Sequence, residues 1–202
     1  MAFTFFFRDA QPLDYAVRSV VPFAAGRSRI RIWDAGAAMG QEPYTLAILL
    51  AETMNQFAFR NLKIYTTDIE EKFGPIIEKG VFPENELQRI PRDLFIKYFL
   101  PNGAPGHYQL CDTIRSCIVH QKHDLLTMRP IGADFCLIVC KNVLLHFQQA
   151  QRIDVIRMFR SALAPGGFLL MEHTQKLPNE LYDMFEQVVP DAQLFRAVEA
   201  KS

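Results

Sequence analysis

The sequence predicts a doubly wound α/β fold with a mostly parallel sheet. Strand-like and helix-like stretches alternate from residue 10 to residue 171, a pattern typical of this class. In the stretch 30–44, an alternating apolar run leads through small residues, with Gly36 and Gly40 among them, into the start of a helix. The nearly continuous apolar run Ala133–Cys140 is typical of a central parallel strand that is buried on both faces. Ligands of such folds bind at the carboxyl ends of the strands.

The elements of the first hundred residues follow from apolar spacing and from glycine and proline breaks. Apolar residues at helical spacing predict a helix that begins near Pro12 and ends before Pro22 and Gly26. The other elements expected here are a strand at 30–35, a helix at 42–55, a strand at 62–67 that ends at Asp68, a helix at 70–79 that stops at Gly80, and a helix at 91–99.

The strongest turn signal of the chain, Pro101–Gly106, lies near its middle. We expect a single domain over residues 1–202, with a small insertion at about 101–117. The elements expected after the turn are one or two strands within 107–123, the buried strand at 133–140, a helix at 148–163, a strand at 168–171, a helix near Leu181–Val188 and a last strand near Leu194–Val198.

The composition is that of a globular protein without a nucleic-acid footprint. Half of the residues are hydrophobic, and 22 basic residues balance 22 acidic ones, so no basic excess favours a nucleic-acid partner. No apolar run approaches the length of a membrane span, and the N-terminus shows no signal peptide. We therefore expect a cytoplasmic protein with no membrane insertion. His120 and His123 come without a cluster of carboxylates or cysteines, so no metal site is predicted.

The four cysteines show no C-x-x-C spacing. We interpret them as buried free thiols in a reducing compartment. Cys136 and Cys140 lie in one strand-like run, and we expect both side chains on the same side of it.

The turn at 36–40 and the next strand end suggest a site for a nucleotide-type cofactor. Small residues, Gly36 included, let backbone N–H groups approach a ligand, and the dipole of the following helix favours an anionic group. A plain strand-to-helix connection is the alternative. Asp68 follows the second strand, where an acidic residue binds the ribose hydroxyls of an adenosine cofactor. The alternative for Asp68 is an N-cap before Ile69, and the two roles are compatible.

Four segments of the chain resemble the CheR family of chemoreceptor glutamate O-methyltransferases. Their order and spacing run through nearly the whole chain, and the elements G-x-E-P-Y and N-V-x-x-x-F are specific when they occur together. The segments are Thr4–Asp9 (T-F-F-F-R-D), Trp33–Thr45 (W-D-A-G-A-A-M-G-Q-E-P-Y-T), Thr67–Ile69 (T-D-I) and Cys140–Phe147 (C-K-N-V-L-L-H-F).

The resemblance implies a Rossmann-like class I methyltransferase sheet, with S-adenosylmethionine as methyl donor and S-adenosylhomocysteine as product. It also places the cofactor contacts of the family at Thr4, Arg8, Glu42, Asp68, Asp124, Leu125, Asn142 and Val143. Carboxylates at these positions suit the ammonium and ribose hydroxyls of the cofactor. The alternatives are helix capping for Glu42 and Asp124, and a turn role for Asn142.

Arg8 and His146 are the candidate catalytic residues. A glutamate carboxylate is already ionised near neutral pH, so the transfer requires positioning and desolvation rather than a general base. Arg8 is the candidate for holding a carboxylate; the alternative is a surface arginine or one paired with Asp9. His146 stands where the family carries tyrosine, and we expect it to face the acceptor. Its alternative is a side chain turned to solvent or packed on Phe147.

The predicted function is methyl esterification of glutamate side chains on a chemoreceptor-like protein. The alternative is a regulatory or interaction module that binds S-adenosylmethionine or S-adenosylhomocysteine with little or no methyl transfer. Two features keep that alternative open: His146, and the lack of a counterpart to the family's helical N-terminal domain. A nucleic-acid amino-methyltransferase would carry [DN]-P-P-[YF] after the fourth strand, where this chain has Lys141–Leu144.

The aromatic segment Phe3–Arg8 is expected to fold over the cofactor as a lid.

Overall fold

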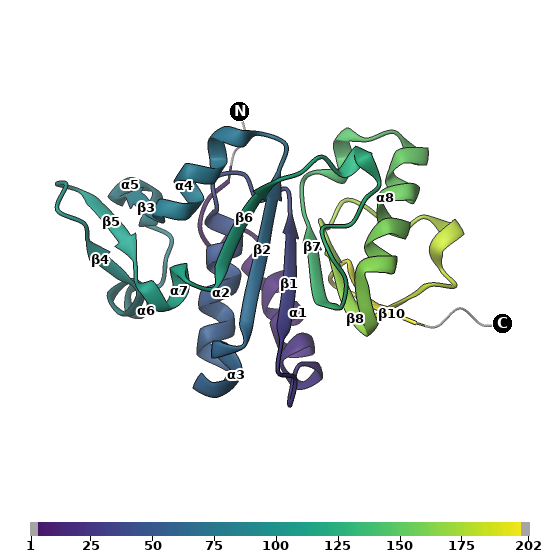
Figure 1. Ribbon diagram of the computed structural model, residues 1–202, viewed down its shortest axis with the longest axis horizontal. Coiled ribbons are helices and arrows are strands. Elements are labelled where there is room, and N and C mark those ends of the chain that lie inside the picture. Colours follow the sequence, from purple (N-terminus) through teal and green to yellow (C-terminus); the bar gives the residue numbers. More distant parts are fainter. Residues whose placement is uncertain (1–3, 199–202) are drawn as a thin grey trace.

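The computed structural model describes residues 4–198, which form a central seven-stranded sheet flanked by helices (Figure 1). The strand order is β6-β2-β1-β7-β8-β10-β9. All neighbouring pairs from β6 to β8 are parallel, whereas β10 runs antiparallel to β8 and to β9. The strands are β1 (Ile30–Ala35), β2 (Leu62–Asp68), β6 (Ile118–Lys122), β7 (Phe135–Cys140), β8 (Leu163–Met171), β9 (Phe185–Gln187) and β10 (Leu194–Ala197). The predicted doubly wound, mostly parallel class is confirmed, and the order reverses between β1 and β7, where such sheets bind ligands.

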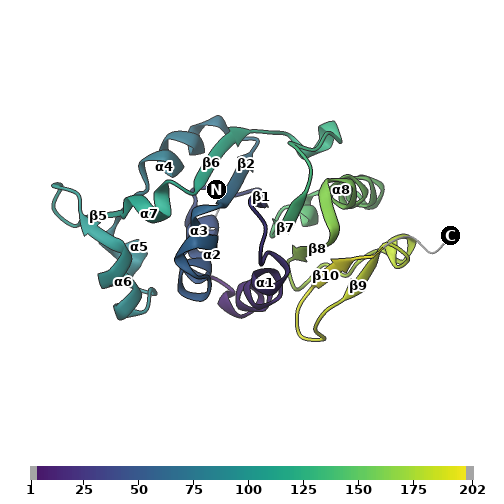
Figure 2. The ribbon, with the colours of Figure 1, turned by 60° about the horizontal axis from the view of Figure 1, so that its bottom comes forward.

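Helices cover both faces of this sheet (Figure 2). On one face, α1 (Ala10–Phe23) and α2 (Gln41–Thr53) share a core with Ile30 and Ile32 of β1. On the other face, α8 (Gln149–Ala162) shares a core with Trp33 and with Ile138 of β7. Successive β1 residues therefore enter opposite cores, because side chains alternate along a strand. The short α3 (Gln56–Arg60) follows α2, and α4 (Gly74–Lys79) lies beside β6.

A second, smaller sheet lies beside the main one (Figure 1). Its order is β3-β5-β4, and both pairs are antiparallel. Its strands are β3 (Val81–Pro83), β4 (Phe99–Pro101) and β5 (His107–Leu110), and the helices around it are α5 (Glu84–Leu87), α6 (Arg92–Tyr98) and α7 (Asp112–Arg115). Phe6 ties this unit to the N-terminal segment, because its buried ring makes edge-on contacts with the rings of Phe82 and Phe99 at 4.9 and 5.5 Å.

The strands that position the site lie where the sequence predicts them. The expected strand at 30–35 is β1 with both its ends, and β2 ends at Asp68 as expected. The apolar run at 133–140 becomes β7, in which all six residues are buried. These predictions held because a run buried on both faces has few other ways to satisfy its backbone groups.

Several predictions of elements were wrong. The segment expected as a helix near Leu181–Val188 forms a single 3-10 turn, Asn179–Leu181, followed by β9. Its apolar spacing imitates a helix, but pairing with β10 decides the conformation. Pro22 lies inside the last turn of α1 and not beyond it, and α7 interrupts the region expected to hold only strands. The strand expected at 168–171 begins already at Leu163.

The prediction for the cysteine pair in β7 was also wrong. Cys136 packs in the core beneath α1 and α2, whereas Cys140 packs in the core beneath α8. The register between β7 and β8 shifts between Phe135 and Leu137, and such an irregularity turns one residue to the other face. All four cysteines are free thiols, as predicted, but only Cys117, Cys136 and Cys140 are buried, whereas Cys111 is partly exposed.

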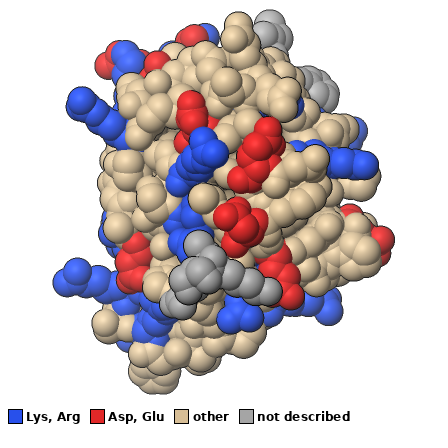
Figure 3. Space-filling model, turned by 90° about the vertical axis from the view of Figure 1, so that its right-hand side faces the viewer, with Lys and Arg blue, Asp and Glu red and all other residues tan. Residues whose placement is uncertain are grey.

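The surface carries no large patch of one charge on the face that holds α8 and β10 (Figure 3), where basic and acidic side chains alternate. Among residues 4–198, none of the helices has the length and apolar character that a membrane crossing would require.

Candidate functional site

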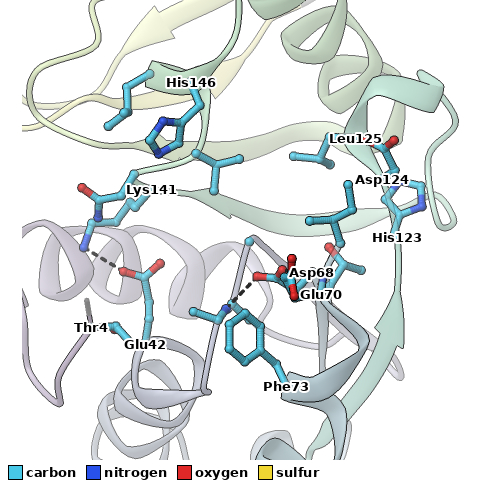
Figure 4. Close-up of a pocket in the computed structure, with 18 of the residues that line it drawn as sticks. Thr4, Glu42, Asp68, Glu70, Phe73, His123, Asp124, Leu125, Lys141 and His146 are labelled. Atoms are coloured by element: carbon cyan, nitrogen blue, oxygen red, sulfur yellow. Dashed lines mark hydrogen bonds and ion pairs between the residues drawn. The ribbon is translucent and has the colours of Figure 1, made fainter. Parts of the chain in front are cut away.

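A cavity of about 730 Å³ opens at the carboxyl ends of β1, β2 and β7 (Figure 4). This volume is in the usual range for sites of small molecules and cofactors. Every residue that the sequence nominated for the site lines this cavity: Thr4, Arg8, Gly36, Glu42, Asp68, Asp124, Leu125, Asn142, Val143 and His146. Residues separated by more than a hundred positions are therefore brought together at the point where the strand order reverses.

The turn after β1 is built differently from the expected N–H cradle. The N–H groups of Gly36 and Ala37 donate to the carbonyl of Thr67 at 2.8 and 3.0 Å, so they bind the neighbouring strand rather than face a ligand. Gly36 has a φ of 99°, and a Cβ on it would lie 2.1 Å from a methyl group of Val143. Glycine is thus required here because the loop after β7 packs directly on its backbone.

Asp68 joins the ends of β1 and β2. Its carboxylate accepts the N–H of Ala38 at 3.0 Å and the N–H of Glu70 at 3.0 Å. The N-cap of the next 3-10 turn is Glu70, so Asp68 is not the N-cap named as its alternative, and it lines the cavity. A carboxylate has about four lone-pair sites, so two backbone bonds leave room for hydroxyl groups of a ligand.

Glu42 is not a helix cap, because the N-cap of α2 is Gly40. The Glu42 carboxylate instead pairs with the ammonium of Lys141 at 2.9 Å, and the two side chains are 15% and 2% exposed. Lys141 also lies 3.6 Å from the carboxylate of Asp9. One buried ammonium therefore joins α2, the end of β7 and the segment before α1.

Asp34 is a buried carboxyl that the sequence analysis did not single out as a site residue. It lies in β1 at 1% exposure, and neither of its oxygens has a hydrogen-bond partner within the described structure. Burial raises the pKa of Asp34 well above 3.8, the charge of Glu42 raises it further, and Lys141 opposes this. Burial therefore favours the neutral form of this carboxyl. The sequence did carry a signal for this residue, because an acidic side chain stands at an inward position of a strand that was predicted to be buried.

Asn142, two residues after the end of β7, has the left-handed φ of 59°. Asparagine tolerates this conformation better than most residues. Its side-chain oxygen accepts a hydrogen bond from Arg8 at 3.4 Å, and its N–H donates to Glu172 at 3.0 Å. Arg8 also lies 3.7 Å from Asp9, so the surface pairing named as its alternative coexists with its place on the cavity wall.

The segment that precedes α1 lies along the cavity. Thr4 and Arg8 line it, Phe6 is fully buried, and the N–H of Phe7 donates to the hydroxyl of Thr45 in α2 at 3.0 Å. Phe3 lies outside the described residues. The position of this segment suits the expected lid, and its closure on a ligand stays a prediction.

The opposite wall comes from the end of β6 and from the loop after β7. Asp124 accepts the N–H of Leu126 at 2.9 Å and so caps a 3-10 turn, as its alternative proposed, while it also lines the cavity. His123, which the sequence did not nominate for this cavity, lies beside it with its ring 5.8 Å from that of Trp33. His146 is exposed to solvent and turns its ring toward the cavity (Figure 4).

Comparisons with known proteins agree with this arrangement. The family model described as CheR methyltransferase, SAM binding domain, matches residues 2–193. A chemotaxis protein methyltransferase of Borreliella burgdorferi is 31% identical over 183 residues, which cover 86% of this chain and 64% of that protein. A probable chemotaxis protein methyltransferase of Rhizobium etli is 27% identical over 192 residues, covering 92% of this chain and 72% of that protein. A chemotaxis protein methyltransferase of Vibrio anguillarum is 29% identical, with coverages of 92% and 68%. The chain thus spans 64–72% of the length of these relatives.

Proposed function

Because this chain belongs to the CheR methyltransferase family, we propose that it transfers the methyl group of S-adenosylmethionine to glutamate side chains of a chemoreceptor-like protein. The observation that carries the proposal is the gathering of all ten nominated residues around one cavity at the reversal point of the sheet. The match to the SAM-binding domain of the family supplies the cofactor.

The residues of the cavity fit this cofactor. When bound, S-adenosylmethionine supplies an activated methyl group on a positively charged sulfur. Asp68 and Asp124 accept ribose hydroxyl or adenine N–H groups, and Glu42 attracts the ammonium of the methionyl part. Asn142 lies at the end of the central strand β7, beside the place where the methyl group must be presented. Arg8 holds a carboxylate, either that of the cofactor or that of the acceptor.

The acceptor carboxylate needs no general base, because it is ionised at neutral pH. The protein therefore accelerates the reaction by holding the carboxylate in line with the methyl group and by removing water from it. Arg8 and His146 approach the cavity from two different elements and both are able to donate hydrogen bonds to an anionic acceptor. We assign them the positioning of the acceptor.

The partner and the location follow from the same proposal. The proposed acceptor is a protein with exposed glutamate side chains, and the names of the relatives, which are chemotaxis protein methyltransferases, support a role in chemotaxis. The proposed location is the cytoplasm, where a chemoreceptor-like protein would present its signalling domain.

The test is a transfer assay with radiolabelled S-adenosylmethionine and cytoplasmic fragments of chemoreceptors. We expect label on the acceptor that is released as methanol by mild base, because methyl esters are base-labile whereas N-methyl groups are not. Replacement of the acceptor glutamates by glutamine should abolish the label. Base-stable label would refute esterification.

His146 provides the control for the non-catalytic alternative. If the wild type binds S-adenosylhomocysteine but transfers no methyl group, and His146→Tyr transfers it, the chain acts as a binding module. If both proteins transfer methyl groups, the pH profile of each between about 5 and 8 shows whether the imidazole contributes, since only histidine changes charge in that range.

A further inference from the structure

We propose that Glu172 is a positioning residue that fixes the wall of the cavity formed by the loop after β7. This loop, residues 141–147, is named the β7 loop. Six of its residues line the cavity: Lys141, Asn142, Val143, Leu145, His146 and Phe147. Glu172 itself does not line the cavity. The inference rests on the cavity being the cofactor site proposed above.

The β7 loop begins with a sharp turn of the backbone. Asn142 has a φ of 59°, so the chain leaves the regular strand at this residue and its N–H no longer joins the ladder between β7 and β8. A backbone N–H in such a place requires another acceptor, because an unpaired buried donor is costly. The carboxylate of Glu172 is that acceptor, at 3.0 Å.

The register of the sheet puts Glu172 in place for this bond. Cys140 is paired with Met171 across the parallel strands, and Glu172 is the residue after Met171. Its side chain therefore starts beside Lys141 and reaches the next N–H along the chain. The β7 loop is thus attached to β8, which is the neighbouring strand of the rigid sheet.

The carboxyl of Glu172 is buried, and only one of its oxygens is paired within the part of the chain that the structure describes. Glu172 is 5% exposed, and one of its oxygens has no hydrogen-bond partner among the described residues. Burial raises the pKa of Glu172, while its own N–H, that of Asn142 and the charges of Lys141 and Arg152 oppose this. An apolar residue at this position would leave the Asn142 N–H without its acceptor, so the bond contributes both to stability and to the position of the β7 loop.

Two further contacts link the position of Asn142 to the wall of the cavity. The side-chain oxygen of Asn142 accepts the hydrogen bond from Arg8, so a rotation of the Asn142 backbone would move this pair. Val143 packs where a Cβ of Gly36 would lie, so the β7 loop is held against β1 on one side and against Glu172 on the other. Release of the Glu172 bond leaves the second contact to hold the loop alone.

The test compares four variants of the full chain. Glu172→Gln keeps an oxygen that accepts the Asn142 N–H, Glu172→Met has similar length and no such acceptor, and Glu172→Asp retracts the carboxylate by one methylene group. Leu170→Met, two residues earlier on the same buried strand, is the control for repacking. Amide hydrogen exchange at Asn142 in ligand-free protein reports the hydrogen bond, calorimetry with S-adenosylhomocysteine reports the cavity, and thermal unfolding reports the fold.

We expect Glu172→Met to exchange the Asn142 amide at least tenfold faster and to bind S-adenosylhomocysteine at least fivefold more weakly than wild type. Glu172→Gln and Leu170→Met should stay within twofold of wild type in both measurements. Wild-type exchange and affinity in Glu172→Met would overturn the inference, as would a Glu172→Gln protein no better than Glu172→Met. If Glu172→Met does not fold, Glu172→Asp takes its place, with the same expected loss and the same refuting result. A wild type that fails to bind S-adenosylhomocysteine would refute the proposed function, whereas the exchange rates still test Glu172 by themselves.

Discussion

Replacement of Asp68 by alanine separates the two roles that its carboxylate has in the structure. The side chain accepts two backbone N–H groups, from Ala38 in the turn after β1 and from Glu70 after β2. It also lines the cavity. The first role contributes to the stability of the empty protein, and the second contributes to the affinity for the cofactor.

The two magnitudes follow from these contacts. A hydrogen bond to a charged group contributes about 1.5–3 kcal/mol. Asp68 is only partly buried, and water will replace part of what is lost, so we expect a total loss of about 2 kcal/mol in the free energy of unfolding rather than the sum of two full bonds. For a chain of this size that corresponds to a fall of about 4–8 °C in Tm. Loss of the bonds to the ribose should weaken binding by about 1–3 kcal/mol, which is roughly 5- to 150-fold.

The assay is calorimetric titration with S-adenosylhomocysteine, combined with thermal unfolding of the ligand-free protein. The matched control is Asn55→Ala. Asn55 accepts the N–H of Ala58 at 2.9 Å and caps α3, and it does not line the cavity. This control should lose about 0.5–2 kcal/mol of stability and keep its affinity.

The reasoning is refuted if Asp68→Ala binds S-adenosylhomocysteine as tightly as the Asn55→Ala control. Asp68 would then serve only to join the turns after β1 and β2, and the ribose would have another partner. Equal Tm values for Asp68→Ala and wild type would refute the stability half of the prediction, since the N–H groups of Ala38 and Glu70 would have lost their acceptor without cost.

Three further results are expected. Gly36→Ala should lower both Tm and affinity, because its Cβ would lie 2.1 Å from Val143, whereas Gly103→Ala, with a similar positive φ and no atom within 4 Å, should show only the smaller backbone cost; equal losses in unfolding experiments would contradict this. Asp34→Asn should be more stable than wild type at pH 8 and equal to it near pH 4. The pKa of Asp34 is raised in the folded state, so its contribution to stability is fully present below the unfolded pKa and is lost as the pH rises. A difference in the free energy of unfolding that does not change with pH would contradict this prediction. Phe6→Ala should lose about 3–5 kcal/mol of stability in denaturant unfolding, because the ring is fully buried, and a loss below about 1 kcal/mol would show that the N-terminal segment is only loosely attached.

The central elements were predictable because their patterns admit one solution. The run at 133–140 is too apolar to lie at a surface, and β7 is buried throughout. The strand ends at Ala35 and Asp68 were marked by small and acidic residues that suit turns. Residues nominated for the cavity from these ends all line it, since parallel strands bring their carboxyl ends to one edge.

Peripheral elements were less predictable, because pairing and not local pattern decides them. The residues of β9 have a helix-like apolar spacing, but β10 offers them an antiparallel partner. The register shift at the start of β7 sends Cys136 to the opposite core from Cys140. Neither the partner strand nor the irregularity leaves a mark in the local sequence.

The sequence by itself determined the class of the sheet, the strand ends that form the cavity and ten of the residues that line it, since these depend on apolar runs and on short motifs. Only the tertiary structure decided what these residues do to one another. Lys141 meets Glu42, and Glu172 meets Asn142, across 99 and 30 positions of chain. Within residues 4–198, neither oxygen of Asp34 has a hydrogen-bond partner, and burial raises the pKa of its carboxyl. The physical reason is that burial and hydrogen-bond partners are properties of the packed strands. A residue type alone does not specify which neighbour will pair with its charge or form its hydrogen bond.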